Sequence, residues 1–119
     1  MKYPLEERVG KFSEDIIDLV KKIKINITNK NIIEQLIRSA TSIGANYFEA
    51  NGSSSKRDFI NKIAISKKEA IETQYWLRLL NKTDNYLKAE ITNLWDEAKQ
   101  IGMIPEFPKL TLLKTNFLI

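Results

Sequence analysis

The charged side chains between Lys56 and Lys82 have the types and spacing best suited to chemistry. On a helix that advances about 100° per residue, the basic ones share an arc of roughly 100°: Arg57, Lys67, Lys68, Arg78 and Lys82. The acidic ones fall on the other side, where Lys62 joins them: Asp58, Glu69 and Glu72. Guanidinium and ammonium groups aligned in this way can donate hydrogen bonds to phosphates. The spacing predicts a basic stripe that binds nucleic acid, and a solvated helix face that serves solubility is the alternative.

A second group of charges combines Arg38 with the carboxylates of Glu49, Glu69 and Glu72. We expect a buried or interfacial salt-bridge network here rather than a catalytic pair of carboxylates. A di-iron site in a helix bundle requires a Glu-x-x-His motif, and the sequence contains no histidine. A hydrolase that uses Glu69 and Glu72 with an all-carboxylate Mg²⁺ site is the weakest alternative.

Cysteine and histidine are both absent from the 119 residues. This excludes thiol nucleophiles, histidine general bases, disulfides and Cys/His zinc sites. The segment Gly52–Arg57 superficially resembles a phosphate-binding loop, but it lacks the Gly-Lys-Ser/Thr ending and a preceding strand. We therefore expect a protein that is not an enzyme and that has no metal and no cofactor.

Four amphipathic segments must position these charges. Apolar residues recur at steps of three and four, which is the period of a helix with one buried face. The predicted inward residues are Leu5, Val9, Phe12, Ile16, Leu19 and Ile23; Ile33, Leu36 or Ile37, Ala40, Ile43 and Tyr47; Phe59, Ile63, Ala70, Leu77 and Leu80; and Leu87, Ile91, Leu94, Ala98 and Ile101. No alternation typical of strands occurs before residue 103.

Polar residues mark where these helices begin. Asn31 with Glu34, and Ser55 with Asp58, have the spacing of a capping box, and Thr83 can cap the last helix. Gly102 is expected to end that helix.

The second helix has a run of small residues, within which Ser39, Ser42 and Asn46 recur on one side. Small side chains let a neighbouring helix approach closely, and these three polar groups are expected to form hydrogen bonds between helices.

Short links between four helices predict an all-α, antiparallel up-down-up-down four-helix bundle over residues 1–102. Residues 103–119 form a tail that contains Pro105 and Pro108. This tail can lie along the bundle, pair with another subunit or be disordered.

The third helix has a second apolar face made by Ile65, Trp76 and Leu79. One bundle interior cannot easily bury both faces of a helix, and a face with a tryptophan often lies between subunits. These residues are therefore candidates for an oligomer interface, and a wide core is the alternative.

Long stretches of the second and third helices resemble a known family. They are Gln35–Ala50, Ser55, Asp58-Phe59, Lys68–Thr73 and Trp76-Leu77. This pattern resembles the four-helix bundle proteins called S23 ribosomal proteins, which are encoded by intervening sequences in bacterial 23S rRNA genes. The resemblance covers roughly residues 5–100, and the proline-containing segment after Gly102 departs from it.

The resemblance implies an antiparallel bundle that assembles as a homopentameric ring without established enzymatic activity. A related protein of the same superfamily is the accessory protein of diversity-generating retroelements, a pentameric bundle that binds nucleic acid and a reverse transcriptase. A fivefold ring would repeat any basic surface five times.

Composition agrees with one folded domain in the cytoplasm. The chain has 43% hydrophobic and 29% charged residues, a net charge of +4 and a pI near 9.3. It shows neither a signal peptide nor a stretch of the roughly 20 apolar residues that a membrane span requires. We expect a self-associating protein that binds RNA or DNA through phosphate contacts. An adaptor that binds another protein, with no role for nucleic acid, is the alternative.

Overall fold

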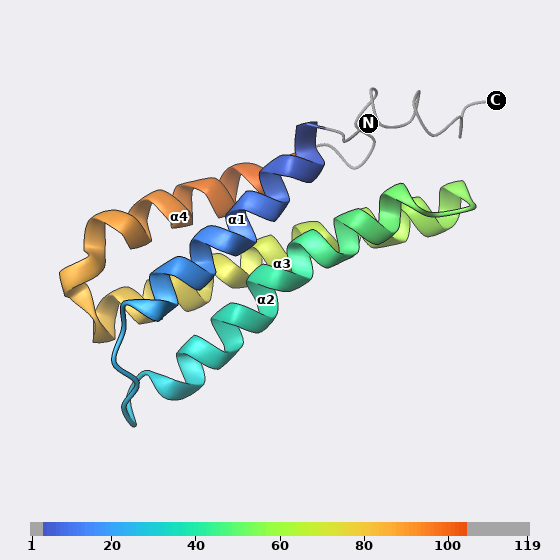
Figure 1. Ribbon diagram of the computed structural model, residues 1–119. Coiled ribbons are helices and arrows are strands. Elements are labelled where there is room, and N and C mark those ends of the chain that lie inside the picture. The colour runs from blue at the N-terminus through green and yellow to red at the C-terminus, as the bar shows by residue number, and fades with distance from the viewer. Residues whose placement is uncertain (1–3, 105–119) are drawn as a thin grey trace.

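The computed structural model describes residues 4–104, which form four α-helices (Figure 1). They are α1 (Pro4–Lys21), α2 (Lys30–Asn51), α3 (Lys56–Thr83) and α4 (Lys88–Gly102), with a 3₁₀ turn, η1 (Asn85–Leu87), before α4. No strand occurs in this part of the chain. The prediction of an all-α protein with four helices is confirmed. Most of the predicted tail, residues 105–119, lies outside the described residues.

The helices lie side by side in an elongated body with extents of 52 × 21 × 20 Å (Figure 1). Each helix contacts two others, because α2 packs on α1 and α3 while α4 packs on α3 and α1. None of the helices within residues 4–104 is long and apolar enough to cross a membrane.

The core is made by the predicted apolar stripes. Every predicted inward residue of α3 is buried, and so are Val9, Phe12, Ile16 and Leu19 of α1. Leu5, Ile37, Leu87 and Leu94 are partly exposed and pack against the edge of the core. Burying one face of each helix supplies most of the driving force for this arrangement, at about 25 cal/mol per Å² of apolar surface.

The small residues of α2 allow α1 to come close. A Cβ atom added to Gly44 would lie 3.4 Å from Ser13 Oγ and 3.6 Å from the Val9 carbonyl oxygen. Ser13 Oγ also lies 3.4 Å from the Ala40 carbonyl, to which it donates a hydrogen bond. These are ordinary van der Waals distances, so alanine would fit at residue 44, whereas a side chain longer than alanine would meet α1.

Polar contacts inside the body join α2 to α3. The hydroxyls of Thr73 and Ser39 are 2.9 Å apart and buried, and Ser66 Oγ donates to the Ile43 carbonyl at 2.8 Å. The expected interhelical role is confirmed for Ser39. The expectation of a bond between helices is wrong for Ser42 and Asn46, because Asn46 Nδ2 donates to the Ser42 carbonyl within α2 at 2.8 Å.

The predicted caps have mixed outcomes. Ser55 caps α3, since its Oγ accepts a hydrogen bond from the Asp58 amide at 3.1 Å. Asn31 does not cap α2, because the helix begins one residue earlier and Asn29 occupies the N-cap position. Thr83 is the last residue of α3 rather than the cap of α4. The last helix ends at Gly102, as predicted.

Candidate nucleic-acid interface

The predicted basic stripe runs along the outer side of α3. Arg57, Lys68, Arg78 and Lys82 are exposed, and Lys67 is half-buried. None of these five cations forms an ion pair with a carboxylate of residues 4–104. Their charges are therefore available to a ligand with negative charge.

Two exposed apolar residues interrupt the stripe. Ile71 is 63% exposed and Tyr75 is 54% exposed, and both lie between Lys68 and Arg78 in the sequence of α3. The helical wheel places Ile71 and Tyr75 within the arc of the cations. The pattern of charged residues alone did not identify these two apolar residues. An exposed aromatic ring among cations can stack on a nucleobase or pack against a protein.

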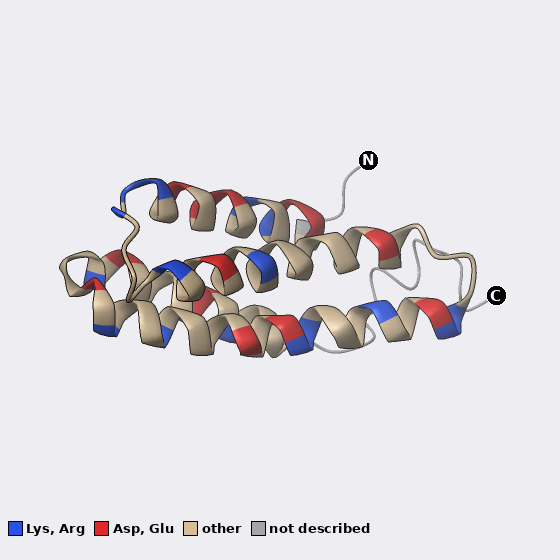
Figure 2. Ribbon diagram, turned by 90° about the horizontal axis from the view of Figure 1, so that it is seen from below, with Lys and Arg blue, Asp and Glu red and all other residues tan. Residues whose placement is uncertain are grey.

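Acidic positions are also present on α3, as Figure 2 shows for the face seen from below. Two of them are engaged by α2. The Arg38 guanidinium forms ion pairs with Glu69, at 3.0 Å, and with Glu72. Glu72 also accepts a hydrogen bond from Trp76 Nε1 at 2.9 Å. The predicted ion pairs therefore exist among Arg38, Glu69 and Glu72, but the network is not buried in one chain, because Arg38 is 46% and Glu72 36% exposed and only Glu69, at 13%, is largely covered.

Glu49 does not belong to this network. It lies eleven residues after Arg38, which is about 16 Å along a helix axis and too far for an ion pair. Its Oε1 instead accepts from Lys62 Nζ at 3.0 Å. This hydrogen bond raises the pKa of Lys62 above its ordinary value of 10.5.

The carboxylates of α4 that form ion pairs are directed toward α1. Glu97 accepts two hydrogen bonds from the Arg8 guanidinium, both at 2.7 Å, and Glu90 pairs with Lys22 at 2.7 Å. The bonds from Arg8 to Glu97 raise the pKa of Arg8. These pairs neutralise acidic groups on the side of α4 that faces α1.

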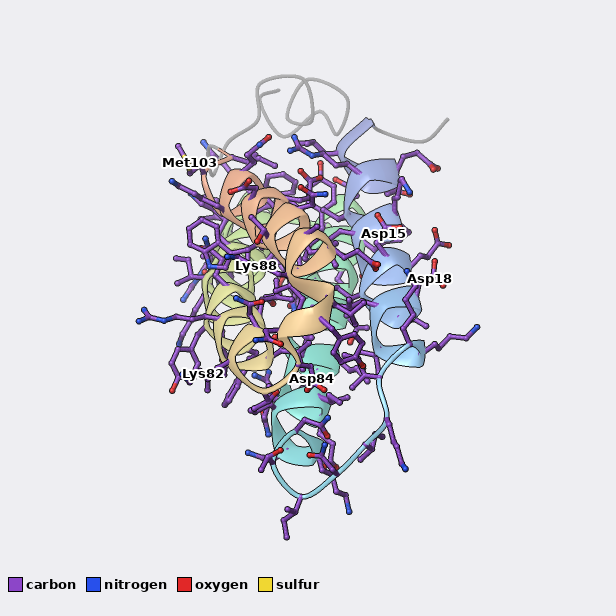
Figure 3. The ribbon with its side chains drawn as sticks, turned by 90° about the vertical axis from the view of Figure 1, so that its left-hand side faces the viewer. Asp15, Asp18, Lys82, Asp84, Lys88 and Met103 are labelled. Atoms are coloured by element: carbon purple, nitrogen blue, oxygen red, sulfur yellow. The ribbon has the colours of Figure 1, made fainter. Side chains whose placement is uncertain are left out.

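Cations of α4 lie on the other side, toward α3. Figure 3 shows Lys82 and Lys88 on the side of α3 and α4, whereas Asp15 and Asp18 lie across the molecule on α1. Lys99 Nζ also lies 5.7 Å from the ring centroid of Trp95. Two helices therefore contribute basic residues to one face.

A basic hollow lies where α3, η1 and α4 meet. It encloses about 530 Å³ and is lined by Arg78, Leu79, Asn81, Lys82, Asn85 and Lys88. Three of these six side chains are cations and none is a carboxylate. Sequence analysis missed Lys88, because the charge pattern of α3 alone does not show which residues of α4 lie beside it.

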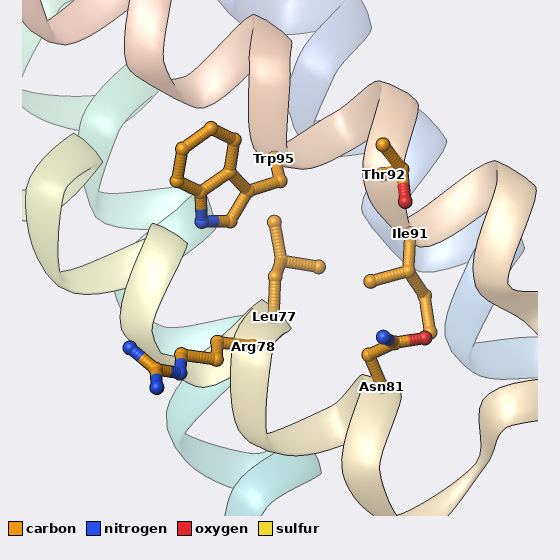
Figure 4. A pocket seen from close by; sticks show the side chains of 6 residues that line it. All are labelled: Leu77, Arg78, Asn81, Ile91, Thr92 and Trp95. Atoms are coloured by element: carbon orange, nitrogen blue, oxygen red, sulfur yellow. The ribbon is translucent and has the colours of Figure 1, made fainter.

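An apolar hollow adjoins the basic hollow. It encloses about 250 Å³ and is lined by Leu77, Arg78, Asn81, Ile91, Thr92 and Trp95 (Figure 4). The Trp95 indole forms one wall, while the Arg78 side chain extends outward from α3 (Figure 4). Sequence analysis did not identify Trp95, although its position between Ile91 and Ala98 on the same helix gave a signal.

The residues expected at an oligomer interface lie between two sides of α3: Trp76 donates to Glu72 beside α2, whereas Leu79 lines the basic hollow. Ile65 is 43% exposed, whereas Trp76 and Leu79 are half-buried. Trp76 packs against the edge of the core and its ring meets that of Tyr75 edge-on, with centroids 5.1 Å apart. In residues 4–104, no cluster of three or more Asp or Glu side chains is arranged to hold a metal ion.

The fold and this surface define an all-α protein of four helices with cations gathered on two neighbouring helices. The chain matches the family described as 23S rRNA-intervening sequence protein over residues 6–105, and it belongs to that family. A similar solved structure is a protein with unknown function from the S23 ribosomal protein family of Bacteroides thetaiotaomicron. It is 32% identical, with a TM-score of 0.69, and the similarity covers 92% of this chain and 96% of that one. No curated protein matches the chain.

Proposed function

We propose that this protein is a non-enzymatic, homo-oligomeric four-helix bundle that binds RNA or DNA through the cations of α3. The observation that carries the proposal is that Arg57, Lys67, Lys68, Arg78 and Lys82 form no ion pair with residues 4–104, while Glu69 and Glu72 on the same helix are engaged by Arg38. Unpaired cations on one face favour contact with phosphates, which requires no recognition of bases.

An antiparallel arrangement of the helices is part of this proposal. Arg8, near the start of α1, pairs with Glu97, near the end of α4, while Lys22 pairs with Glu90 at the opposite ends of those helices. Two such pairs at opposite ends support helices that run in opposite directions.

A homopentamer is the proposed assembly, with Ile65, Trp76 and Leu79 at the contact between subunits. Ile65 is exposed beside the Arg38 network, where a neighbouring subunit would bury it. Light scattering tests the assembly, since a pentamer has about five times the 13.8 kDa mass of one chain. A mass of one chain would contradict it.

The nucleic-acid proposal is tested by the salt dependence of binding. Each phosphate contact contributes about −0.7 to −0.9 to the slope of log K against log salt. Replacing Lys67, Lys68 and Arg78 by Glu should lower the affinity for nucleic acid at least tenfold. The slope of log K against log salt should become less negative by about 2.

A matched variant provides the control for charge. Lys21, Lys24 and Lys30 are exposed, lie outside α3 and form no ion pair with the described residues. Replacing these three by Glu changes the net charge equally but should leave the slope within about 1 of the parent's. Equal affinity of the parent and the α3 variant would exclude the stripe as a binding site.

A second candidate function is an adaptor that binds another protein. Exposed Ile71 and Tyr75 in the middle of the stripe favour it, because apolar groups at a surface often contact proteins. Binding of a defined protein, lost in the variant Tyr75→Ala, together with no binding of RNA or DNA at low salt, would support the adaptor.

A further inference from the structure

The apolar hollow between α3 and α4 has the features of a site for one flat ring. Its apolar residues are Leu77, Ile91 and Trp95, and Asn81 and Thr92 add an amide and a hydroxyl. Its volume of about 250 Å³ is below the ~300–1,000 Å³ of drug-sized ligand sites, so it suits a single ring system. A nucleobase combines an apolar face with a polar edge, which matches this lining.

Asn81, which lines the hollow, has one polar atom without a hydrogen-bond partner among residues 4–104. Oδ1 of Asn81 is buried and accepts no hydrogen bond from residues 4–104. Buried acceptors without partners are uncommon in folded proteins and call for an explanation. After a rotation of the amide, this oxygen could accept from an N–H group on the edge of a base.

The basic hollow is directly adjacent, because Arg78 and Asn81 line both hollows. Lys82 and Lys88 supply two more cations there. The nearby carboxylate of Asp84 is turned away into the protein, where it accepts from Asn29 Nδ2 at 3.1 Å. A negatively charged group would therefore meet three cations and no lining carboxylate.

We propose that the two hollows together hold one unpaired nucleotide of a single-stranded nucleic acid. The base stacks on Trp95 in the apolar hollow, and its phosphates contact Arg78, Lys82 and Lys88 in the basic hollow. This inference rests on the proposed function and adds the form of nucleic acid that is bound. It tolerates any sequence, because every base has a flat face that can stack.

The lining of the hollows favours this ligand over two others. A base in a duplex is stacked on both faces and cannot enter a hollow with an aromatic wall unless it is flipped out. A second copy of this chain could meet the three cations only by placing one of its own acidic side chains against them, and light scattering tests that contact below.

Fluorescence of Trp95 in the full-length protein tests the proposal. The chain has two tryptophans, so the variant Trp76→Phe, which keeps an aromatic ring at residue 76 and is used once light scattering shows that it keeps the parent's mass, leaves Trp95 as the reporter. The probes are a 12-residue deoxythymidine strand and the same strand paired with deoxyadenosine. We expect quenching of Trp95 fluorescence by the single strand and not by the duplex.

Substitutions test the same site through binding affinity. In the otherwise native chain, Trp95→Leu should weaken binding of the single strand about tenfold and leave duplex binding unchanged. Asn81→Asp, which keeps the shape and adds a negative charge, should also weaken single-strand binding. Phe48→Leu is the control, because it removes an exposed aromatic ring of α2 that lies outside the stripe and lines neither hollow.

The outcomes separate this inference from the proposed function. Salt-dependent binding of both probes without quenching, or with equal affinity in Trp95→Leu, would overturn the nucleotide site and retain the basic stripe. No binding of either probe would overturn both. A change of mass in Trp95→Leu by light scattering would assign the hollow to a contact between copies and would also overturn the inference. Trp95 quenching in the reporter protein is decisive even if Trp95→Leu does not fold.

Discussion

Asn29 connects three parts of the chain, and its replacement by alanine should destabilise the fold. The residue is fully buried at the N-cap of α2. Its Oδ1 accepts from the Asn26 amide at 2.8 Å, while Nδ2 donates to the Lys24 carbonyl at 3.0 Å and to Asp84 Oδ2 at 3.1 Å. Asn29 therefore fixes the connection between α1 and α2 against the end of α3.

The cost of Asn29→Ala follows from these bonds. Each neutral hydrogen bond is worth about 1 kcal/mol and the bond to an ionised carboxylate about 1.5–3 kcal/mol. Water can reach Lys24 and Asn26, which are exposed, and Asp84 Oδ2 keeps a bond from Thr83 Oγ1 at 2.8 Å. After this partial compensation, the free energy of unfolding should fall by about 3 kcal/mol.

Urea unfolding followed by circular dichroism at equal protein concentration measures this loss. The matched control is Asn31→Ala, because Asn31 is exposed and lies in the first turn of the same helix. That change should alter the free energy of unfolding by no more than about 0.5 kcal/mol. Equal losses for the two variants would refute the argument that the tertiary contact, rather than helix capping in general, makes Asn29 important.

Three other predictions concern buried hydroxyls and pH. Thr73→Val should lower the free energy of unfolding by about 1 kcal/mol in the same urea assay, because it removes the buried bond to Ser39. Nucleic-acid affinity should change less than threefold between pH 6 and 9 at constant salt, because the chain has no histidine or cysteine. The Glu49 contact raises the pKa of Lys62 in the folded state above its ordinary value of 10.5. The contribution of this contact to the free energy of unfolding is therefore complete below pH 10.5 and is lost as pH rises through the folded-state pKa. The difference in unfolding free energy between the parent and Lys62→Met should therefore shrink between pH 9 and 12.

The core could be predicted from the sequence because burial depends on a local period. Val9, Phe12 and Ile16 share one face of any α-helix, whatever packs against it. The cap at Ser55 was also predictable, since its bond to the Asp58 amide spans three residues. Features decided within one or two helical turns are therefore the ones that the sequence reveals.

The failed predictions depend on contacts between distant residues. Asn31 has the spacing of a capping box, yet Asn29 takes the N-cap, and its side chain, which makes no capping bond, reaches Asp84, 55 residues away. Glu49 shares a family-like segment with Arg38, but its partner is Lys62 on the next helix, 3.0 Å away. Neither partner can be identified from the periodicity of one helix.

The candidate site was predictable only in its α3 half. A helical wheel of α3 finds Arg78 and Lys82, but it cannot show that Lys88 lies across from them. That position is fixed by the core, because Ile91 and Ala98 must face inward and successive residues are about 100° apart. With those two residues buried, Trp95 falls on the side of α4 that faces α3. The same apolar period that folds the chain thus places an aromatic ring beside the cations of a neighbouring helix.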